Sequence, residues 1–150
     1  MKPSWRESYF LRWHECREKV RFSEVDAFDV VWHGHYIKYF EIGRLDLSGK
    51  YSLTPEYMKQ QGYFAPVVDL GCTYKEPARL GDEMIIRTTV EPSEKAALTF
   101  RYEIVRASDE IILAKGYTAH VLLTLEGKMI YSVPDEIKKP VGDMLDYCND

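Results

Sequence analysis

The segment at 36–51, YIKYFEIGRLDLSGKY, most constrains the fold because apolar side chains cover most of its surface. Its spacing predicts a helix with one narrow polar side, formed by Lys38, Glu41, Arg44 and Ser48. The rest of the circumference is apolar and consists of Tyr36, Ile37, Tyr39, Phe40, Ile42, Leu45 and Leu47. A helix that is apolar on so many sides is buried among other elements. The remainder of the chain is therefore expected to enclose it.

The strands needed to enclose this helix are predicted mainly after it. One strand is predicted before the helix, at 16–22, and the residues that share its face are Cys16, Glu18, Val20 and Phe22. Further extended segments are predicted at 64–78, 82–91, 97–106, 110–125 and 126–134. The first of these contains Pro66, Gly71 and Pro77, which indicate a bent strand or an edge strand. An α+β fold, with one antiparallel sheet curled around a central helix, accounts for both patterns.

Shorter features between these elements carry their own signals. Thr54 as N-cap and Pro55 at the first helical position predict a short helix that stops at Gly62. A hairpin turn is predicted at 108–109. In the strand at 110–125, the side chains expected to share one face are Ile111, Leu113, Tyr117, Ala119, Val121, Leu123 and Leu125. The segment 126–134 is expected to close the sheet, and the polar segment from 134 onward to form a single helical turn.

The bulk properties are those of one ordinary globular domain. The 150 residues are expected to form a single domain over 1–150, with its core at about 14–135. The net charge of −4 argues against a nucleic-acid partner. The three cysteines are widely separated and odd in number, which favours neither a disulfide framework nor a zinc site. No long apolar run or signal peptide is evident, so we expect a cytoplasmic protein without a membrane span.

The chemically richest segment is EVDAFDVVWHGHY at 24–36, where two acids and two histidines surround an apolar VVW step. His33 and His35 are spaced to share one side of a strand but not of a helix, and no HExxH signature accompanies them. No GxSxG motif is present, so a nucleophilic triad is not expected. We therefore expect neither a metal ion nor a bound cofactor in this segment.

A lone carboxylate in front of a helix offers a simpler chemistry. The first N–H groups of a helix that begins at about 34–36 are unpaired and, with the helix dipole, can hold a developing oxyanion. Gly34 would let a carbonyl approach the backbone, and Asp26 would attack it or activate a water. A thioester suits this small set of groups, because a thiol of pKa about 8.5 leaves without a general acid. The alternative interpretation is that Asp26 or Asp29 only caps the helix.

The stretch VRFSEVDAFDVVWHGHYIKYFEIGR at 20–44 resembles the hotdog-fold acyl-CoA thioesterases. The pattern of that family runs strand, acid, spacer, VV, aromatic, H, small residue, Y, then YFE and R. A second stretch, YKEPARLGDEM at 74–84, resembles the family's Y..PA..GD turn. The resemblance is closest to the branch typified by 4-hydroxybenzoyl-CoA thioesterase and the Tol-Pal-associated thioesterase. It implies a hotdog fold that hydrolyses an acyl-CoA to a free acid and coenzyme A, with coenzyme A as leaving group.

The resemblance also implies roles for individual residues. By position, Asp26 matches the catalytic carboxylate, and the backbone N–H of His33 matches the donor that polarises the thioester carbonyl. The residues implied at the substrate are the His33 side chain, Trp32, Gly34 and Tyr36, with Lys75, Arg79 and Lys95 at the coenzyme A phosphates. Trp32 and Tyr36 are alternatively core aromatics. The acyl group would enter an apolar tunnel between the helix and the sheet. The family further implies a homodimer joined edge to edge, with active sites at the interface, often paired into a homotetramer.

Three positions depart from the family pattern. Val25 stands where Thr or Cys is common, Asp29 where Gly is common, and His35 where Asn or Ser is usual. A second carboxylate near Asp26 would raise its pKa or cap the helix. Two other functions stay open: a hotdog dehydratase or hydratase, whose usual His-Phe-Pro loop is missing, and a non-catalytic acyl-CoA or acyl-carrier-protein binding module.

Overall fold

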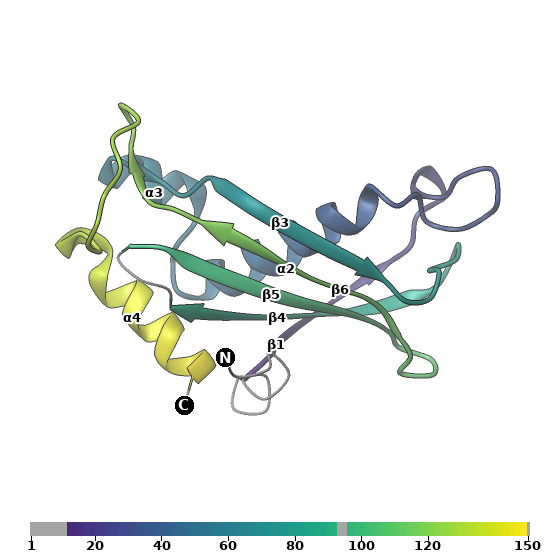
Figure 1. Cartoon of the computed structure of the whole chain (residues 1–150). Helices are drawn as coiled ribbons and strands as arrows, with labels where there is room; N and C mark the ends of the chain where they lie inside the picture. Colours follow the sequence, from purple (N-terminus) through teal and green to yellow (C-terminus); the bar gives the residue numbers. More distant parts are fainter. Residues whose placement is uncertain (1–11, 93–95, 150) are drawn as a thin grey trace, which may run out of the picture.

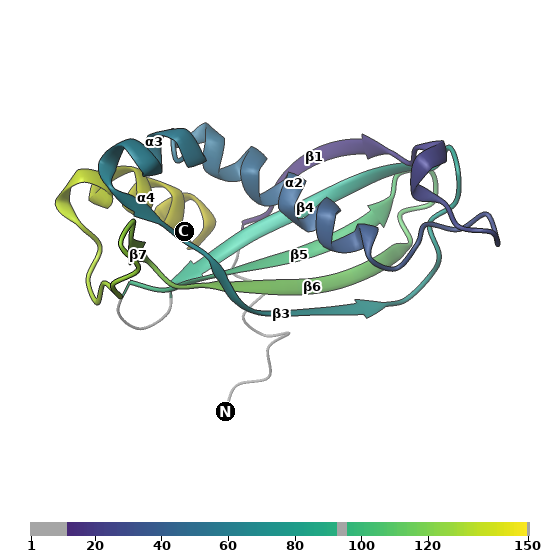
Figure 2. The ribbon, with the colours of Figure 1, turned by 90° about the horizontal axis from the view of Figure 1, so that it is seen from above.

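The computed structural model describes residues 12–92 and 96–149, in which an antiparallel sheet folds around a long helix (Figures 1 and 2). The sheet has the strand order β1-β4-β5-β6-β3. Its strands are β1 His14–Lys19, β3 Val67–Tyr74, β4 Glu83–Pro92, β5 Leu98–Arg106 and β6 Ile112–His120. Helix α2, His35–Lys50, crosses one face of this sheet. The predicted α+β hotdog architecture is confirmed.

One side of α2 is buried against the sheet, whereas its outer side is open. The ring of Phe40 stacks on Tyr102 of β5 with centroids 4.6 Å apart, and Leu47 is fully buried. The predicted division of α2 into a buried apolar side and a polar side is wrong at two positions. Leu45 is 38% exposed, whereas Ser48, expected on the polar side, is only 6% exposed because the C-terminal helix covers it. A single chain therefore leaves part of α2 uncovered.

Several other elements lie where the sequence predicted them. Helix α3, Pro55–Gln61, starts at Thr54, whose Oγ1 accepts a hydrogen bond from the Tyr57 N–H at 3.1 Å. It ends at Gly62, which has the left-handed φ of +94°. Strand β3 is an edge strand, as its prolines and glycine indicated. The first strand, in contrast, is shifted toward the N-terminus, and Phe22 is 81% exposed outside it.

The predicted orientation of the strand at 110–125 holds at Leu113, which is fully buried, but is wrong for most of β6 after it. The core receives Ala114, Thr118 and His120 from β6, whereas the hydroxyl of Tyr117 bonds to an exposed carboxylate on the edge strand. A β-bulge at the start of β6 interrupts the alternation, because Ile112 pairs with Val105 and Ala114 with Ile104, which leaves Leu113 as the extra residue. After β6 the chain leaves the main sheet. Strand β7, Leu123–Thr124, pairs with β2, Tyr63–Phe64, in a separate two-stranded ribbon.

The C-terminal segment also differs from its prediction. The segment 126–134 does not close the sheet and contributes only an isolated bridge between Leu123 and Met129. A 15-residue helix, α4 Asp135–Asn149, replaces the expected single turn. Its buried residues recur at helical spacing and are Ile137, Val141, Met144 and Cys148. They pack α4 against β4 and α3, at the end of the sheet seen on the left of Figure 1.

The described helices include none whose length and hydropathy would allow it to cross a membrane.

Candidate active site

The loop before α2 folds into a small hairpin at 24–32. The Trp32 N–H donates to the Glu24 carbonyl at 2.9 Å, and an isolated β-bridge joins the next pair of residues toward the tip. The Val31 N–H donates to the Ala78 carbonyl at 2.8 Å, which attaches the hairpin to the turn before β4. These bonds hold the loop in one position relative to the start of α2.

Asp26 lies near the tip of this hairpin and keeps one carboxylate oxygen free. Its Oδ1 accepts a hydrogen bond from the Phe28 N–H at 2.8 Å, whereas no described residue bonds to Oδ2. The Asp26 backbone pairs with Val30 at 2.8 Å and with Asp29 at 3.0 Å. Neither acid caps α2, because its N-cap is Gly34 and no side chain bonds there. The helix-capping interpretation of Asp26 and Asp29 is therefore wrong.

The peptide groups at the start of α2 have free donors. In the described part of the chain, the N–H groups of His33 and Gly34 donate no hydrogen bond. The hydroxyl of Tyr74 donates to the His33 carbonyl at 2.7 Å and fixes this peptide. The N-terminal end of the helix dipole adds a positive potential at the same place. These groups have the chemistry that an oxyanion requires.

A shallow depression of about 250 Å³ lies beside these amides. Its lining residues are Val31, His33, Tyr36, Tyr74, Lys75, Glu76 and Pro77. The structure thus brings together three of the predicted site residues, His33, Tyr36 and Lys75. The Tyr36 hydroxyl accepts a hydrogen bond from the Ala78 N–H at 3.1 Å, and burial raises the pKa of this phenol. Asp26 does not line the depression.

Trp32 and Gly34 form a contact that the sequence did not indicate. Trp32 is 48% exposed, and its ring lies on Gly34, where an added Cβ would overlap it. The Trp32 ring also contacts His35, with centroids 5.6 Å apart. Trp32 is therefore not a core aromatic. The absence of a side chain at Gly34 makes room for the indole rather than for a substrate carbonyl on that side.

The predicted phosphate-binding residues are only partly placed. Lys75 lines the depression and is exposed, and Arg79 is exposed in the turn before β4. The Arg79 backbone N–H donates to Asp82 Oδ2 at 2.9 Å, and its strand-like bridge to Val30 ties the turn to the hairpin. Lys95 lies outside the described residues. Lys75 and Arg79 thus flank the hairpin from the same turn region.

Glu24 is a residue of this region that sequence reasoning missed. Glu24 is 3% exposed. Its Oε1 accepts hydrogen bonds from the Tyr39 hydroxyl at 3.0 Å and the Arg21 N–H at 2.8 Å. The Lys38 ammonium lies 4.0 Å from the other oxygen. Burial, and then the carboxylate itself, raise the pKa of Tyr39. The position of Glu24 three residues after Arg21, as in a capping box, was the available signal.

The described side chains include no group of three or more His, Cys, Asp or Glu residues suited to hold a metal ion.

Comparison with known proteins gives matches over most of the chain. The family model described as the thioesterase-like superfamily matches residues 20–141. The chain is 28% identical to the acyl-CoA thioesterase YbgC of Haemophilus influenzae over 122 residues, which are 80% of this chain and 88% of that protein.

Solved structures with the same fold cover nearly the whole chain. A hypothetical protein from Thermus thermophilus, TT1821, is 33% identical with a TM-score of 0.77, and the match covers 87% of this chain and 98% of that one. A 1,4-dihydroxy-2-naphthoyl-CoA thioesterase from Synechocystis has a TM-score of 0.80 at 20% identity, over 89% of this chain and 98% of that one. At that identity the second match shows the fold alone.

Proposed function

Because the chain belongs to the thioesterase-like superfamily and is a thioester hydrolase, we propose that its substrate is an acyl-CoA, cleaved to a free acid and coenzyme A. The observation that supports this proposal is that Asp26 has a free carboxylate oxygen and that the amides of His33 and Gly34 are open. Both belong to one hairpin and the helix start that follows it. These are the two groups that acyl transfer from a good leaving group requires.

The proposed reaction begins with the thioester carbonyl oxygen at the N–H of His33. Asp26 Oδ2 either attacks the carbonyl carbon or removes a proton from a water that attacks it. The tetrahedral oxyanion is stabilised by the backbone donors and the helix dipole, and it collapses by breaking the carbon–sulfur bond. Coenzyme A leaves as a thiolate and takes up a proton. In the covalent variant, one water then hydrolyses the mixed anhydride, which releases the free acid and regenerates Asp26.

The proposed catalytic unit is a dimer. Strand β3 is an edge strand whose exposed apolar side chains are Val67, Val68, Leu70 and Tyr74, all between 43% and 59% exposed. A long apolar edge with unpaired backbone groups is a template for another strand. A second copy that pairs with β3 would cover these side chains and face the depression beside Tyr74. Pairing of dimers into a tetramer, and a cytoplasmic location, stay predictions.

Within this dimer, the adenosine and phosphates of coenzyme A are proposed to lie over the turn before β4. Lys75 and Arg79 expose their side chains there. Because both side chains are solvated, their contribution is electrostatic attraction that salt weakens.

A free-thiol assay over a panel of acyl-CoAs tests the proposal. Wild type should release coenzyme A, and Asp26→Asn should lose at least about a hundredfold of the rate while still binding substrate. Asp29→Asn is the matched control, because Asp29 is exposed and should leave turnover within about twofold. Loss or addition of water without thiol release would instead favour the dehydratase. Binding without either reaction would favour the binding module.

A further inference from the structure

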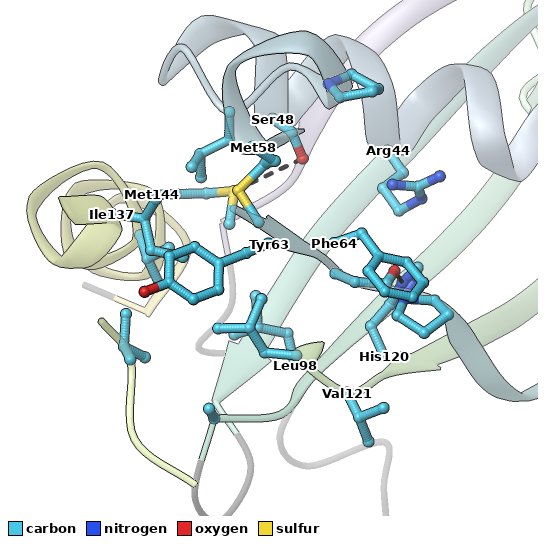
Figure 3. Close-up of a pocket in the computed structure, with 18 of the residues that line it drawn as sticks. Arg44, Ser48, Met58, Tyr63, Phe64, Leu98, His120, Val121, Ile137 and Met144 are labelled. Carbon is cyan, nitrogen blue, oxygen red and sulfur yellow. Dashed lines mark hydrogen bonds between the residues drawn. The ribbon is translucent and has the colours of Figure 1, made fainter. Parts of the chain in front are cut away.

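A second and larger cavity lies at the other end of α2. It has a volume of about 410 Å³ and is enclosed by the later turns of α2, by α3, α4 and the ends of β5 and β6 (Figure 3). The residues that line its walls include Ser48, Met58, Phe100, Leu122, Ile137 and Met144. The volume lies in the range of small-molecule sites in proteins. The cavity is therefore large enough to hold a ligand.

The buried polar side chains in the walls of this cavity already have partners. His120 uses both ring nitrogens, with the Ala65 carbonyl at 2.8 Å and the Thr118 hydroxyl at 2.9 Å. Burial lowers its pKa, so the ring is neutral. The Ser48 hydroxyl contacts the sulfur of Met144 at 4.0 Å. The cavity thus offers hydrocarbon and aromatic surface but no buried donor or acceptor that awaits a ligand.

Three other polar side chains are on the lining, Tyr63, Arg44 and Lys59, and the last of these is exposed on α3. The Tyr63 hydroxyl bonds to Glu136 at 3.5 Å, and Arg44 forms an ion pair with Glu41 at 3.0 Å. In Figure 3, Arg44 and Phe64 lie on the opposite side of the cavity from Ile137 and Met144. Phe64, Leu45 and Leu125 also line the cavity and are 40%, 38% and 47% exposed, so the cavity is open to solvent beside them. A ligand that entered beside Phe64 would meet the apolar side chains of Ile137 and Met144 further in.

We infer that this cavity binds the hydrocarbon part of an unbranched aliphatic acyl group, so that the substrates are fatty acyl thioesters rather than hydroxylated aromatic ones. The inference rests on the proposed function and narrows it. An aliphatic chain loses nothing by entering a cavity without free polar atoms, and each buried CH₂ group adds affinity. A phenolic hydroxyl would lose its hydrogen bonds to water and find no partner.

The route to the cavity also favours a flexible chain. Arg44 lies about 16 Å along the helix axis from His33, at 1.5 Å per residue. Between these two residues on α2, the rings of Tyr36, Tyr39 and Phe40 are buried in the core of the same chain. In the dimer proposed above, antiparallel pairing of two β3 strands brings the end at Tyr74 near the opposite end of the partner's strand. The partner's β3 begins directly after Pro66, which lines the cavity. The acyl chain of a substrate bound at His33 therefore enters the cavity of the partner subunit.

Methyl NMR of the methionines tests the location without relying on turnover. Met58 and Met144 line the cavity, whereas Met129 is 50% exposed outside it and Met84 is buried elsewhere in the core. Dodecanoic acid added to the wild-type protein should shift the methyl signals of Met58 and Met144 and leave those of Met84 and Met129 in place. 4-Hydroxybenzoic acid should shift neither cavity signal. Dodecanoic acid that leaves the Met58 and Met144 signals unmoved would overturn the inference.

Chain-length profiles test the use of the cavity in turnover. Met58→Trp fills the cavity from α3 and should lower kcat/KM for hexadecanoyl-CoA about tenfold or more relative to butanoyl-CoA. Met129→Trp, the same change outside the cavity, should leave the profile of wild type unchanged. Preference of wild type for hydroxybenzoyl-CoA over every aliphatic substrate contradicts the inference but keeps the proposed function. Absence of thiol release from every acyl-CoA contradicts the proposed function, while the NMR result still decides the cavity.

Discussion

The hydroxyl of Tyr39, in the second turn of α2, donates a 3.0 Å hydrogen bond to the buried carboxylate of Glu24 at the base of the hairpin. Glu24 precedes Asp26 by two residues in the chain, and its carbonyl accepts the Trp32 N–H that closes the hairpin. The side chain and the backbone of Glu24 thus join the helix to both arms of the loop. This residue sets where the proposed catalytic acid stands relative to the helix start.

Removal of the Tyr39 hydroxyl should therefore weaken both the fold and the reaction. Tyr39→Phe leaves a buried carboxylate oxygen with one partner fewer, which should lower the free energy of unfolding by about 1–3 kcal/mol. The rate kcat should fall more than KM changes, because the acid is displaced while the substrate surfaces stay. Urea unfolding and thiol-release kinetics measure the two effects. Tyr57→Phe, which removes an exposed hydroxyl bond to the Glu136 carbonyl, is the control. Equal effects of the two variants would contradict this role of Glu24.

His120 should make stability depend on pH. Burial lowers its pKa below the ordinary value of 6.5, so below that pH the unfolded chain binds a proton that the folded chain does not. The free energy of unfolding should therefore not depend on His120 above about pH 6.5, and it should decrease as the pH falls from there to the folded pKa. His120→Gln removes this titration. Unfolding curves at several pH values should show a smaller loss between pH 7 and about pH 5.5 in the variant than in wild type. The same loss in both proteins would show that other groups cause it.

Two glycines should respond oppositely to the same substitution. A Cβ on Gly116 in β6 would overlap the Phe40 ring and the carbonyl oxygen of Gly71, whereas a Cβ on Gly49 in α2 meets nothing. Gly116→Ala should lower the free energy of unfolding by about 1–3 kcal/mol through overpacking. Gly49→Ala should raise it by about 0.5–1 kcal/mol through helix propensity. Thermal or denaturant unfolding separates the two. An unchanged free energy of unfolding in Gly116→Ala would mean that the Phe40 ring moves aside without loss of stability.

A charge on the edge strand should separate the proposed dimer. Leu70 is 47% exposed on β3, and Leu70→Lys places an ammonium group on the edge that a second copy would cover. Sedimentation or light scattering should give about half the mass of wild type, with loss of most thiol release because the depression loses its cover. Ile111→Lys changes a side chain that is 42% exposed at the β5–β6 turn and should keep the mass. A dimer that persists in Leu70→Lys would place the interface elsewhere.

Local patterns in the sequence were enough to predict the main architecture. The apolar surface of 36–51 predicted a helix that needs a sheet around it, and α2 lies against that sheet. Thr54 and Gly62 predicted both ends of α3, and the prolines of 64–78 predicted an edge strand. The unpaired amides near His33 follow from the start of any helix. Each of these features depends on residues that are close together in the chain.

Other features were decided by contacts between distant residues. The side of β6 that faces the core changes at a bulge in its pairing with β5, and Ser48 is buried because α4, nearly a hundred residues later, covers it. Tyr39, which donates a hydrogen bond to the Glu24 carboxylate, is on α2, and the Trp32 ring occupies the space over Gly34. The large cavity exists only where α2, α3 and α4 meet the end of the sheet. Side-chain periodicity specifies which residues an element can bury, but the surface that buries them is supplied by the rest of the fold.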